Sequence, residues 1–527
     1  MPQRSPRTSA PAVHRPPRPV AVIDIGASAI RMAIAEIRDA GEVRTLDTLV
    51  QPVSLGREAF ETRRLSRKNI ERAAEILKQY QRVLREYGIT DPANVRVVAT
   101  SAVREAANRL AFTDRIFVVT GLSVEPIDEA EVNRITYMGI TPQLRAHNIL
   151  DNGRTVVLEV GGGSTELLVV RSGNVLSSDS YRLGSLRMLK TLETARTGAV
   201  RRRPILENHI RRALTLVSEA VSSDGGLNMV AIGGDIRIAT RLLLGDDWEG
   251  GELAEIDVKA LSKLTDEIVV LDDDTIVKRY GVSFIEAETL GPALLSYSML
   301  ANHFGLKKIF VSDTNLRDGL LHDMAVGGSW TAEFRNQIVR SALSLGRKFH
   351  FDEMHTRNVA ELSRKLFDQL HSAHQLDSRH EVLLYVAALL HEIGTLINVR
   401  SHHKHALYII KNSELFGLSK GELLQVGLVA RYYRRAAPQP SHVDYMSLSR
   451  DERVVVSKLA AILRIASALD DTRSGRIREI ECVREGDRLV INVPGVSDVS
   501  LERIALQQKS SLFRDIYGMS VLLRAGN

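Results

Sequence analysis

The sequence predicts an α/β protein with two similar lobes, followed by an all-helical domain and a small α+β domain. Two apolar hairpins each enclose a glycine turn that follows an acidic residue. From Trp330 to about Leu469, apolar residues recur at the spacing of amphipathic helices, and histidines concentrate there. After Ser474-Gly475 the spacing changes to that of strands, over residues 477–483 and 488–493, before a last short helix and strand.

The two hairpins resemble each other. Residues 21–37 read AVIDIGASAIRMAIAEI and residues 156–170 read VVLEVGGGSTELLVV. Both flanking runs are apolar, as strands buried in a mixed sheet should be. Each hairpin is followed by another strand that leads into a helix, VRVVAT before SAVREAANRLAF and the strand at 229–232 before GGDIRIATRLLL. The pattern favours a duplicated lobe, with the two turns facing each other across a cleft, over two unrelated hairpins in one α/β domain.

The chain of 527 residues is too long for one hydrophobic core. Residues 1–19, MPQRSPRTSAPAVHRPPRP, hold prolines and arginines but no acidic residue and no apolar signal segment, which predicts a disordered basic tail. The predicted domains are then a first lobe over 20–145, a second lobe over 146–326, a helical domain over 330–474 and the small α+β domain over 475–527.

Composition restricts the function further. No apolar run reaches the roughly 20 residues that a membrane-spanning helix needs, so no membrane partner is expected. A single cysteine, Cys482, rules out an intramolecular disulfide and is compatible with the cytoplasmic location that we expect. The formal net charge of +6 favours a polyanionic partner, with a solvated basic surface as the alternative. No specific nucleic-acid partner is expected.

Three turns that contain glycine follow one another, at Asp24–Ser28, Glu159–Ser164 and Gly233–Asp235. Glycine lets consecutive backbone N–H groups approach a ligand, and such groups form a concave site for an anion. Carboxylates beside that site would repel a phosphate unless they hold a divalent cation or orient water. We therefore predict a metal or water site at Glu159 and Glu166. Hairpin turns without a ligand also use glycine, which is the alternative.

Several stretches, in order, resemble the Ppx/GppA family of exopolyphosphatases and guanosine pentaphosphate phosphohydrolases over roughly residues 20–475. In the lobes they are AVIDIGASAIRM, VVATSAVREAAN, VVLEVGGGSTELLVV, YRLGSLRM, AIGGDIRIAT and VSDTNLRDGLL. In the helical region, LLHEIGTLINVRSHHKHALYIIKNSEL resembles the HD-like domain of long family members. The resemblance implies two actin-like lobes of the ASKHA, ribonuclease H-like fold. It also implies hydrolysis of a terminal phosphate from polyphosphate or pppGpp, Mg²⁺ in the cleft between the lobes, and a homodimer.

The resemblance also assigns roles to individual positions. It implies that Arg104 contacts the phosphate chain, with a solvated helix arginine as the alternative. The resemblance further implies that Glu159 and Glu166 are metal ligands and catalytic residues. The phosphate-binding turns it implies contain Asp24, Gly26, Ser28, Gly161, Gly162, Gly163, Ser164, Gly233 and Gly234.

The chain departs from the family pattern at positions that the resemblance assigns to phosphate binding and catalysis. The family's first turn reads Asp-x-Gly-Ser-Asn-Ser, and this chain has Ala27 and Ala29 at the positions of the two serines. Glu159 replaces the aspartate that precedes the family's second turn. In IDEAEVNRITYMGI, Val132 stands at the position of the family's proposed general base, and valine cannot accept a proton. Glu131 is the candidate replacement, although consecutive helix side chains point about 100° apart, and Glu129 is the alternative.

The helical domain departs in the same way. Metal-bearing HD domains use His…His-Asp…Asp, whereas this chain has His355, His391, Glu392 and Ser467 at those positions. We therefore expect no metal in this domain and a structural role that includes contact with polyanions.

Three function classes follow. The first is a cytoplasmic hydrolase that acts on polyphosphate or guanosine polyphosphate. The second is a catalytically impaired relative that binds the same ligands as a sensor, motivated by Val132. The third, a sugar kinase or chaperone-type ATPase, is disfavoured by the order of the motifs.

Overall fold

The computed structural model describes residues 17–38, 41–150, 153–194, 199–221, 226–245, 248, 250–326 and 332–526. The chain forms two compact units. The first takes the chain up to Gly173 and from Ser180 to Ser329, and the second takes Asn174–Asp179 and the chain from Trp330 onward. Most of the predicted tail lies outside the described residues. Its predicted end is too late, because the first strand already begins at Arg18.

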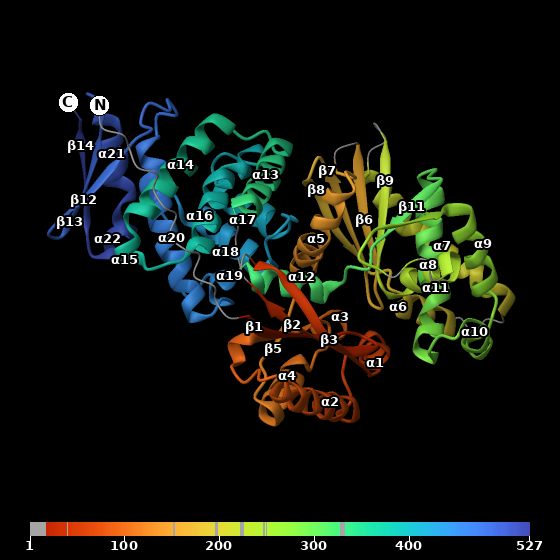
Figure 1. Ribbon diagram of the computed structural model, residues 1–527. Coiled ribbons are helices and arrows are strands. Elements are labelled where there is room, and N and C mark those ends of the chain that lie inside the picture. Colours follow the sequence, from red (N-terminus) through yellow and green to blue (C-terminus); the bar gives the residue numbers. More distant parts are fainter. Residues whose placement is uncertain are drawn as a thin grey trace, which may run out of the picture. The chain divides into compact units, whose positions relative to one another are not determined.

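The first lobe contains a five-stranded mixed sheet in the order β3-β2-β1-β4-β5 (Figure 1). β1 pairs antiparallel with β2 and parallel with β4, and β4 pairs parallel with β5. The strands are β1 (Arg18–Ile25), β2 (Ala29–Ile37), β3 (Val43–Pro52), β4 (Val95–Ala99) and β5 (Val124–Pro126).

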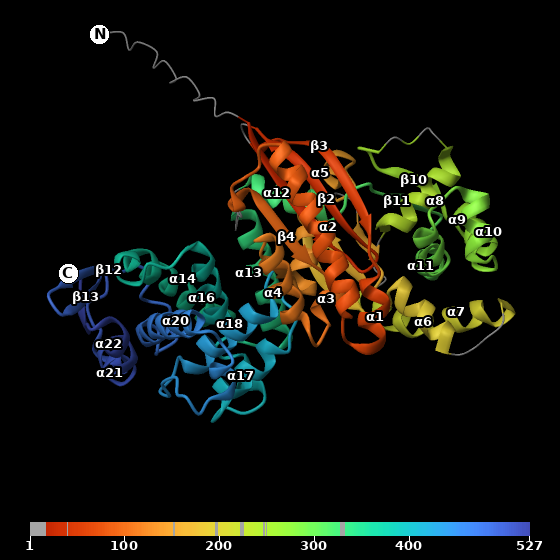
Figure 2. The same ribbon diagram turned by 90° about the horizontal axis from the view of Figure 1, so that it is seen from below.

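Helices cover both faces of this sheet, because alternate strand residues point to opposite sides and both sets are apolar. One core involves α1 (Leu55–Thr62), α2 (Arg67–Glu86), α3 (Ser101–Arg104) and α4 (Arg109–Thr120). Helices α2 and α4 lie against each other in both ribbon views (Figures 1 and 2). The other core involves α5 (Glu129–Ala146) and α12 (Leu316–Ala325).

The second lobe repeats this topology. Its sheet has the order β10-β11-β9-β6-β7-β8, in which β6 pairs antiparallel with β7 and parallel with β9, as β1 does with β2 and β4. The strands are β6 (Arg154–Val160), β7 (Thr165–Arg171), β8 (Asn174–Tyr181), β9 (Leu227–Ile232), β10 (Ala254–Asp257) and β11 (Lys308–Val311). The helices are α6 (Ser185–Thr194), α7 (Ala199–Ala220), α8 (Gly234–Leu244), α9 (Val258–Val269), α10 (Asp273–Tyr280) and α11 (Phe284–His303). The predicted duplication is confirmed.

The second lobe ends earlier than the sequence predicts. Helix α12, expected in the second lobe, buries Leu316, Leu320 and Leu321 in the core that lies on β1, β2 and α5 of the first lobe. The reason is a close helix crossing with no room for side chains. A Cβ on Gly319 of α12 would meet the carbonyl oxygen of Ile135 on α5 at 2.2 Å.

Replacing Gly319 by alanine is therefore expected to destabilise the protein by about 1–3 kcal/mol, because backbone atoms must move to admit the methyl group. Gly421→Ala is the matched control, since its nearest neighbour would be a serine hydroxyl at 3.9 Å. Thermal unfolding of both variants measures the difference, and equal melting temperatures would contradict this description of the helix crossing.

The second unit consists of helices followed by a small sheet. The helices are α13 (Ala332–Lys348), α14 (Glu353–Gln369), α15 (His371–His374), α16 (Ser378–Leu390), α17 (His402–Lys411), α18 (Lys420–Tyr432), α19 (Val443–Met446) and α20 (Arg450–Leu469). A three-stranded sheet in the order β12-β13-β14 follows, with β12 (Glu481–Glu485), β13 (Arg488–Val493) and β14 (Ser520–Ala525). Two helices, α21 (Ser500–Lys509) and α22 (Ser511–Tyr517), precede β14.

The sequence predicts the change from helices to strands here, but β12 begins four residues later than expected and α21 was not expected. Among the described helices, none is long and apolar enough to cross a membrane.

Candidate functional site

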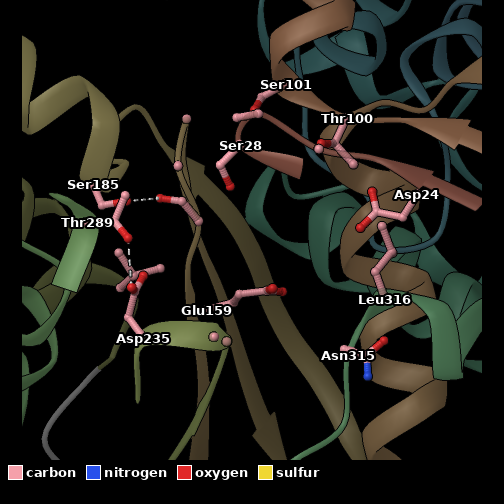
Figure 3. Close-up of a pocket in the computed structure, with 18 of the residues that line it drawn as sticks. Asp24, Ser28, Thr100, Ser101, Glu159, Ser185, Asp235, Thr289, Asn315 and Leu316 are labelled. Carbon is pink, nitrogen blue, oxygen red and sulfur yellow. Dashed lines mark hydrogen bonds between the residues drawn. The ribbon is translucent and has the colours of Figure 1, made fainter. Parts of the chain in front are cut away.

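A cavity of about 250 Å³ lies in the first unit where the two hairpin turns meet. All three predicted glycine turns line it, together with α3, α5, α8 and the start of α12. Figure 3 shows side chains from both lobes directed into this space, with Asp24 on one wall and Glu159 extending from the other towards it. The lining includes every predicted phosphate-binding residue, namely Asp24, Gly26, Ser28, Arg104, Gly161, Gly162, Gly163, Ser164, Gly233 and Gly234.

The two hairpin turns close in the same way. The N–H of Gly26 donates to the carbonyl of Ala29 at 3.0 Å, and the N–H of Gly161 donates to the carbonyl of Ser164 at 2.9 Å. These two amides therefore hold the turns rather than a ligand. A Cβ on Gly163 would approach the Ser101 hydroxyl to 2.4 Å and the Phe60 ring to 2.5 Å, so a side chain at this position would displace both.

Glu159 and Glu166 lie opposite each other on β6 and β7. Burial raises the pKa of both carboxyls, and that of Glu166 rises to about 7. One oxygen of Glu166 accepts from the hydroxyls of Ser164 at 2.7 Å and Ser180 at 3.0 Å, while its Oε2 is buried without a hydrogen-bond partner. The site therefore holds a carboxyl that changes its charge near neutral pH.

Two aspartates extend the acidic surface of the cavity. Burial raises the pKa of Asp24, with Arg31 and Arg317 opposing it, and its Oδ1 has no hydrogen-bond partner. Burial also raises the pKa of Asp235 to about 6, although Thr289 donates to its carboxylate at 2.9 Å. Sequence reasoning placed Asp235 in the third turn but gave it no role.

Four arginines balance these acids, Arg31, Arg104, Arg237 and Arg317. Burial lowers the pKa of both Arg237 and Arg317, which is the expected result of moving a cation out of water. Arg104 donates to the carbonyl of Ile127 at 3.0 Å and pairs with Glu129 at 3.1 Å. Arg104 thus lines the cavity in a fixed position and is not a solvated helix arginine.

Sequence reasoning missed Arg31, Arg237 and Arg317 as site residues. Arg31 had a detectable signal, since it is the single cation in the apolar strand AIRMAIAEI and pairs in register with Asp24. The other two stand on α8 and α12, and nothing in their local sequence shows that both helices line the same cavity.

The structure does not bring Glu131 into the cavity. Its carboxylate accepts from Arg134 at 2.6 and 2.8 Å and pairs with Arg96 at 3.4 Å. Burial opposes ionisation of Glu131, but Arg134 and Arg96 outweigh it and lower its pKa. The expectation that Glu131 replaces the missing base is therefore corrected, because its neighbour Val132 is the residue that lines the cavity.

The acidic side chains fit a hard divalent cation such as Mg²⁺. Asp24 and Glu166 each have a buried oxygen without a hydrogen-bond partner, which a cation would satisfy. Among the described residues, no three ligand atoms of this cavity lie within 4.8 Å of one another. A cation here would thus take one or two carboxylates, with the rest of its ligands from water and substrate, as Mg²⁺ does in phosphoryl-transfer sites.

Comparison with known proteins agrees with this geometry. A match to the Ppx/GppA phosphatase family covers residues 33–326, and a match to Ppx/GppA phosphatase domain III covers residues 339–510. Guanosine-5'-triphosphate,3'-diphosphate pyrophosphatases of Vibrio parahaemolyticus and Vibrio vulnificus are each 24% identical to the chain, over 90% of it and 91% of their own length.

Solved structures share the fold over about three fifths of the chain. An exopolyphosphatase from Cytophaga hutchinsonii aligns with a TM-score of 0.52 at 20% identity, over 59% of this chain and 98% of that one. The Aquifex aeolicus Ppx/GppA family member aligns with a TM-score of 0.50 at 24% identity, over 60% of this chain and 100% of that one. With its two actin-like lobes and matches that extend from residue 33 to residue 510, the chain belongs to the Ppx/GppA phosphatase family.

Proposed function

We propose that the chain is a phosphoanhydride hydrolase that removes the terminal phosphate of pppGpp. The observation that carries the proposal is the cavity itself, in which glycine turns and four arginines meet carboxylates with unpartnered oxygens. Arginines bind a phosphate chain, and the carboxylate oxygens without hydrogen-bond partners can coordinate the divalent cation that accompanies such a chain. The printed names of the Vibrio relatives support pppGpp as the substrate. Polyphosphate is the alternative substrate, and the homodimer and the cytoplasmic location stay predictions.

The residues of the cavity can perform this reaction together. Arg31, Arg237 and Arg317 would hold the terminal phosphate and stabilise the charge that develops on its oxygens. Mg²⁺, held by Glu159 and Glu166, would neutralise the phosphate chain. The oxygen of a water molecule would bond to the terminal phosphorus as the bond to the bridging oxygen breaks. Without a bound cation, burial raises the pKa of Glu166 to about 7. Bound Mg²⁺ would lower this pKa and keep Glu166 ionised at neutral pH, where its free oxygen would accept the proton of that water.

A product assay tests the proposal. Purified protein is incubated with pppGpp, long-chain polyphosphate or ATP, with Mg²⁺ or with EDTA, and phosphate and nucleotide products are quantified. We expect one phosphate released for each ppGpp formed, only with Mg²⁺, and loss of this activity in Glu159→Gln. If no substrate yields more phosphate with the natural protein than with Glu159→Gln, the chain is not this hydrolase.

A specific observation favours a second candidate, a slow or inactive relative that binds the same phosphate chain as a sensor. Val132 lines the cavity with 9% of its surface exposed, at the position where the family pattern predicts a base. Tight binding of pppGpp without turnover would favour this candidate.

A further inference from the structure

The helical unit holds a second group of side chains with ligating atoms, separate from the cavity described above. One ring nitrogen of His355, one of His391 and one carboxylate oxygen of Glu392 all lie within 4.8 Å of one another. All three side chains are buried, with exposed fractions of 5%, 0% and 9%. His355 stands on α14, and the other two follow the end of α16.

The hydrogen bonds of the two rings determine which nitrogen is available. Nδ1 of His355 lies 2.8 Å from a carboxylate oxygen of Asp470, and Nδ1 of His391 lies 2.6 Å from the carbonyl oxygen of Ala388. A carbonyl and a carboxylate accept, so Nδ1 carries the proton in each neutral ring and Nε2 carries a lone pair. Nε2 of His391 is buried and has no hydrogen-bond partner.

Each ring therefore offers one imidazole lone pair, and one nitrogen of each ring lies within 4.8 Å of a Glu392 carboxylate oxygen. A water molecule has two hydrogens and cannot donate to all three acceptors, whereas a divalent cation can bind all three. The carbonyl and carboxylate behind the rings are the partners that orient histidine ligands in metal sites. We propose that His355, His391 and Glu392 bind one divalent transition-metal ion.

The donor set indicates the class of metal. Two imidazole nitrogens and one carboxylate suit Zn²⁺, Mn²⁺, Fe²⁺, Co²⁺ or Ni²⁺, whereas Mg²⁺ prefers oxygen ligands alone. His402 is not a further ligand, because Nδ1 donates to the carbonyl of Val399 at 2.7 Å and Nε2 accepts from the hydroxyl of Tyr433 at 2.5 Å. The sequence predicts no metal here because Glu392 replaces an aspartate and Ser467 stands at the position of the last aspartate. The fold nevertheless brings the longer carboxylate of Glu392 within reach of both rings.

A cavity of about 270 Å³ gives access to His355 and Glu392 from solvent. Arg473 and Lys509 also line it, and both are paired with carboxylates that offset their charge. Arg473 donates to both oxygens of Glu392 at 2.8 Å, and Lys509 donates to Asp471 at 2.7 Å. Arg473 thus holds the Glu392 carboxylate in place while leaving lone pairs for a metal.

The test measures metal binding by the full-length protein and is independent of the proposed hydrolase activity. Protein treated with a chelator is titrated with Co²⁺ in millimolar Mg²⁺, which occupies sites made of oxygen ligands, and the visible absorption of bound Co²⁺ is followed. We expect one Co²⁺ per chain. Asp470→Asn, which weakens the orientation of His355, should lower the Co²⁺ affinity about 10–100-fold, and His391→Gln should lower it further.

Two further variants keep the test decisive. Glu392→Gln retains the shape of a ligand in case replacement of the buried His391 unfolds the domain, and His371→Gln replaces an exposed histidine of the same unit as control. Co²⁺ should raise the melting temperature of the natural protein and of His371→Gln, but not that of Glu392→Gln. Equal Co²⁺ binding by the natural protein, Glu392→Gln and Asp470→Asn would overturn the proposal, as would no Co²⁺ binding at all.

Discussion

Replacing Val132 by glutamate is expected to raise the rate of phosphate release, and the gain reaches the usual contribution of a positioned general base, about 10²–10⁴-fold, to the extent that Glu166 does not already supply that base. Val132 lines the cavity from α5, so a carboxylate at this position would reach the space that the attacking water occupies. Glu131 cannot act in its place, because its carboxylate is held by Arg134 and Arg96. The measurement is kcat for phosphate release from pppGpp at saturating Mg²⁺.

Val132→Gln is the matched control, because it has the size of glutamate but cannot accept a proton at neutral pH. An increase in Val132→Glu that Val132→Gln lacks would identify the natural protein as a slow enzyme or a sensor. If the natural protein is already fast and Val132→Glu adds nothing, Glu166 suffices as the base and the sensor candidate is rejected.

The second large expected effect is a dependence of folding stability on pH that arises from Glu166. The pKa of Glu166 rises from 4.5 to about 7 in the folded protein because of burial, so its carboxylate binds a proton more strongly in the folded than in the unfolded state. Its contribution to stability is therefore full below about pH 4.5 and is lost as the pH rises towards 7. At about 1.4 kcal/mol for each pH unit, the loss amounts to about 3 kcal/mol.

Glu166→Gln removes this titration. Between pH 4.5 and pH 8, we expect the natural protein to lose about 3 kcal/mol more stability than Glu166→Gln, as measured by thermal unfolding across that range. Mg²⁺ should reverse the trend, stabilising the natural protein at pH 8 more than the variant, because it binds the ionised carboxylate. Glu61→Gln, at an exposed position on α1, is the control. Parallel pH profiles for the natural protein and Glu166→Gln would show that Glu166 does not titrate in this range.

The features that could be predicted from the sequence are those that depend on one short stretch of residues. Each hairpin turn lies within one short stretch, so Asp24, Glu159 and the glycines could be assigned before the fold was seen. Helical geometry likewise indicates that Glu131 and Val132 point in different directions, and the structure adds the arginines that hold Glu131.

What could not be predicted depends on distant segments meeting. Arg237 and Arg317 enter the cavity because α8 and α12 both line it, and α12 joins the first lobe through its glycine crossing with α5. The group at His355, His391 and Glu392 depends on the distance between α14 and the end of α16. In the sequence, glutamate in place of aspartate at position 392 suggests that a metal ligand is lost. Only the fold shows that the Glu392 carboxylate still reaches the two histidine rings.

The most direct measurement is the position of oxygen from labelled water after turnover of pppGpp with Mg²⁺. If the inter-lobe cavity directs water to the terminal phosphorus, ¹⁸O from the solvent will appear in the released phosphate and not in ppGpp, and Glu159→Gln will produce neither labelled phosphate nor ppGpp. Label in ppGpp, release of pyrophosphate, or equal labelled phosphate from Glu159→Gln would contradict hydrolysis at this site.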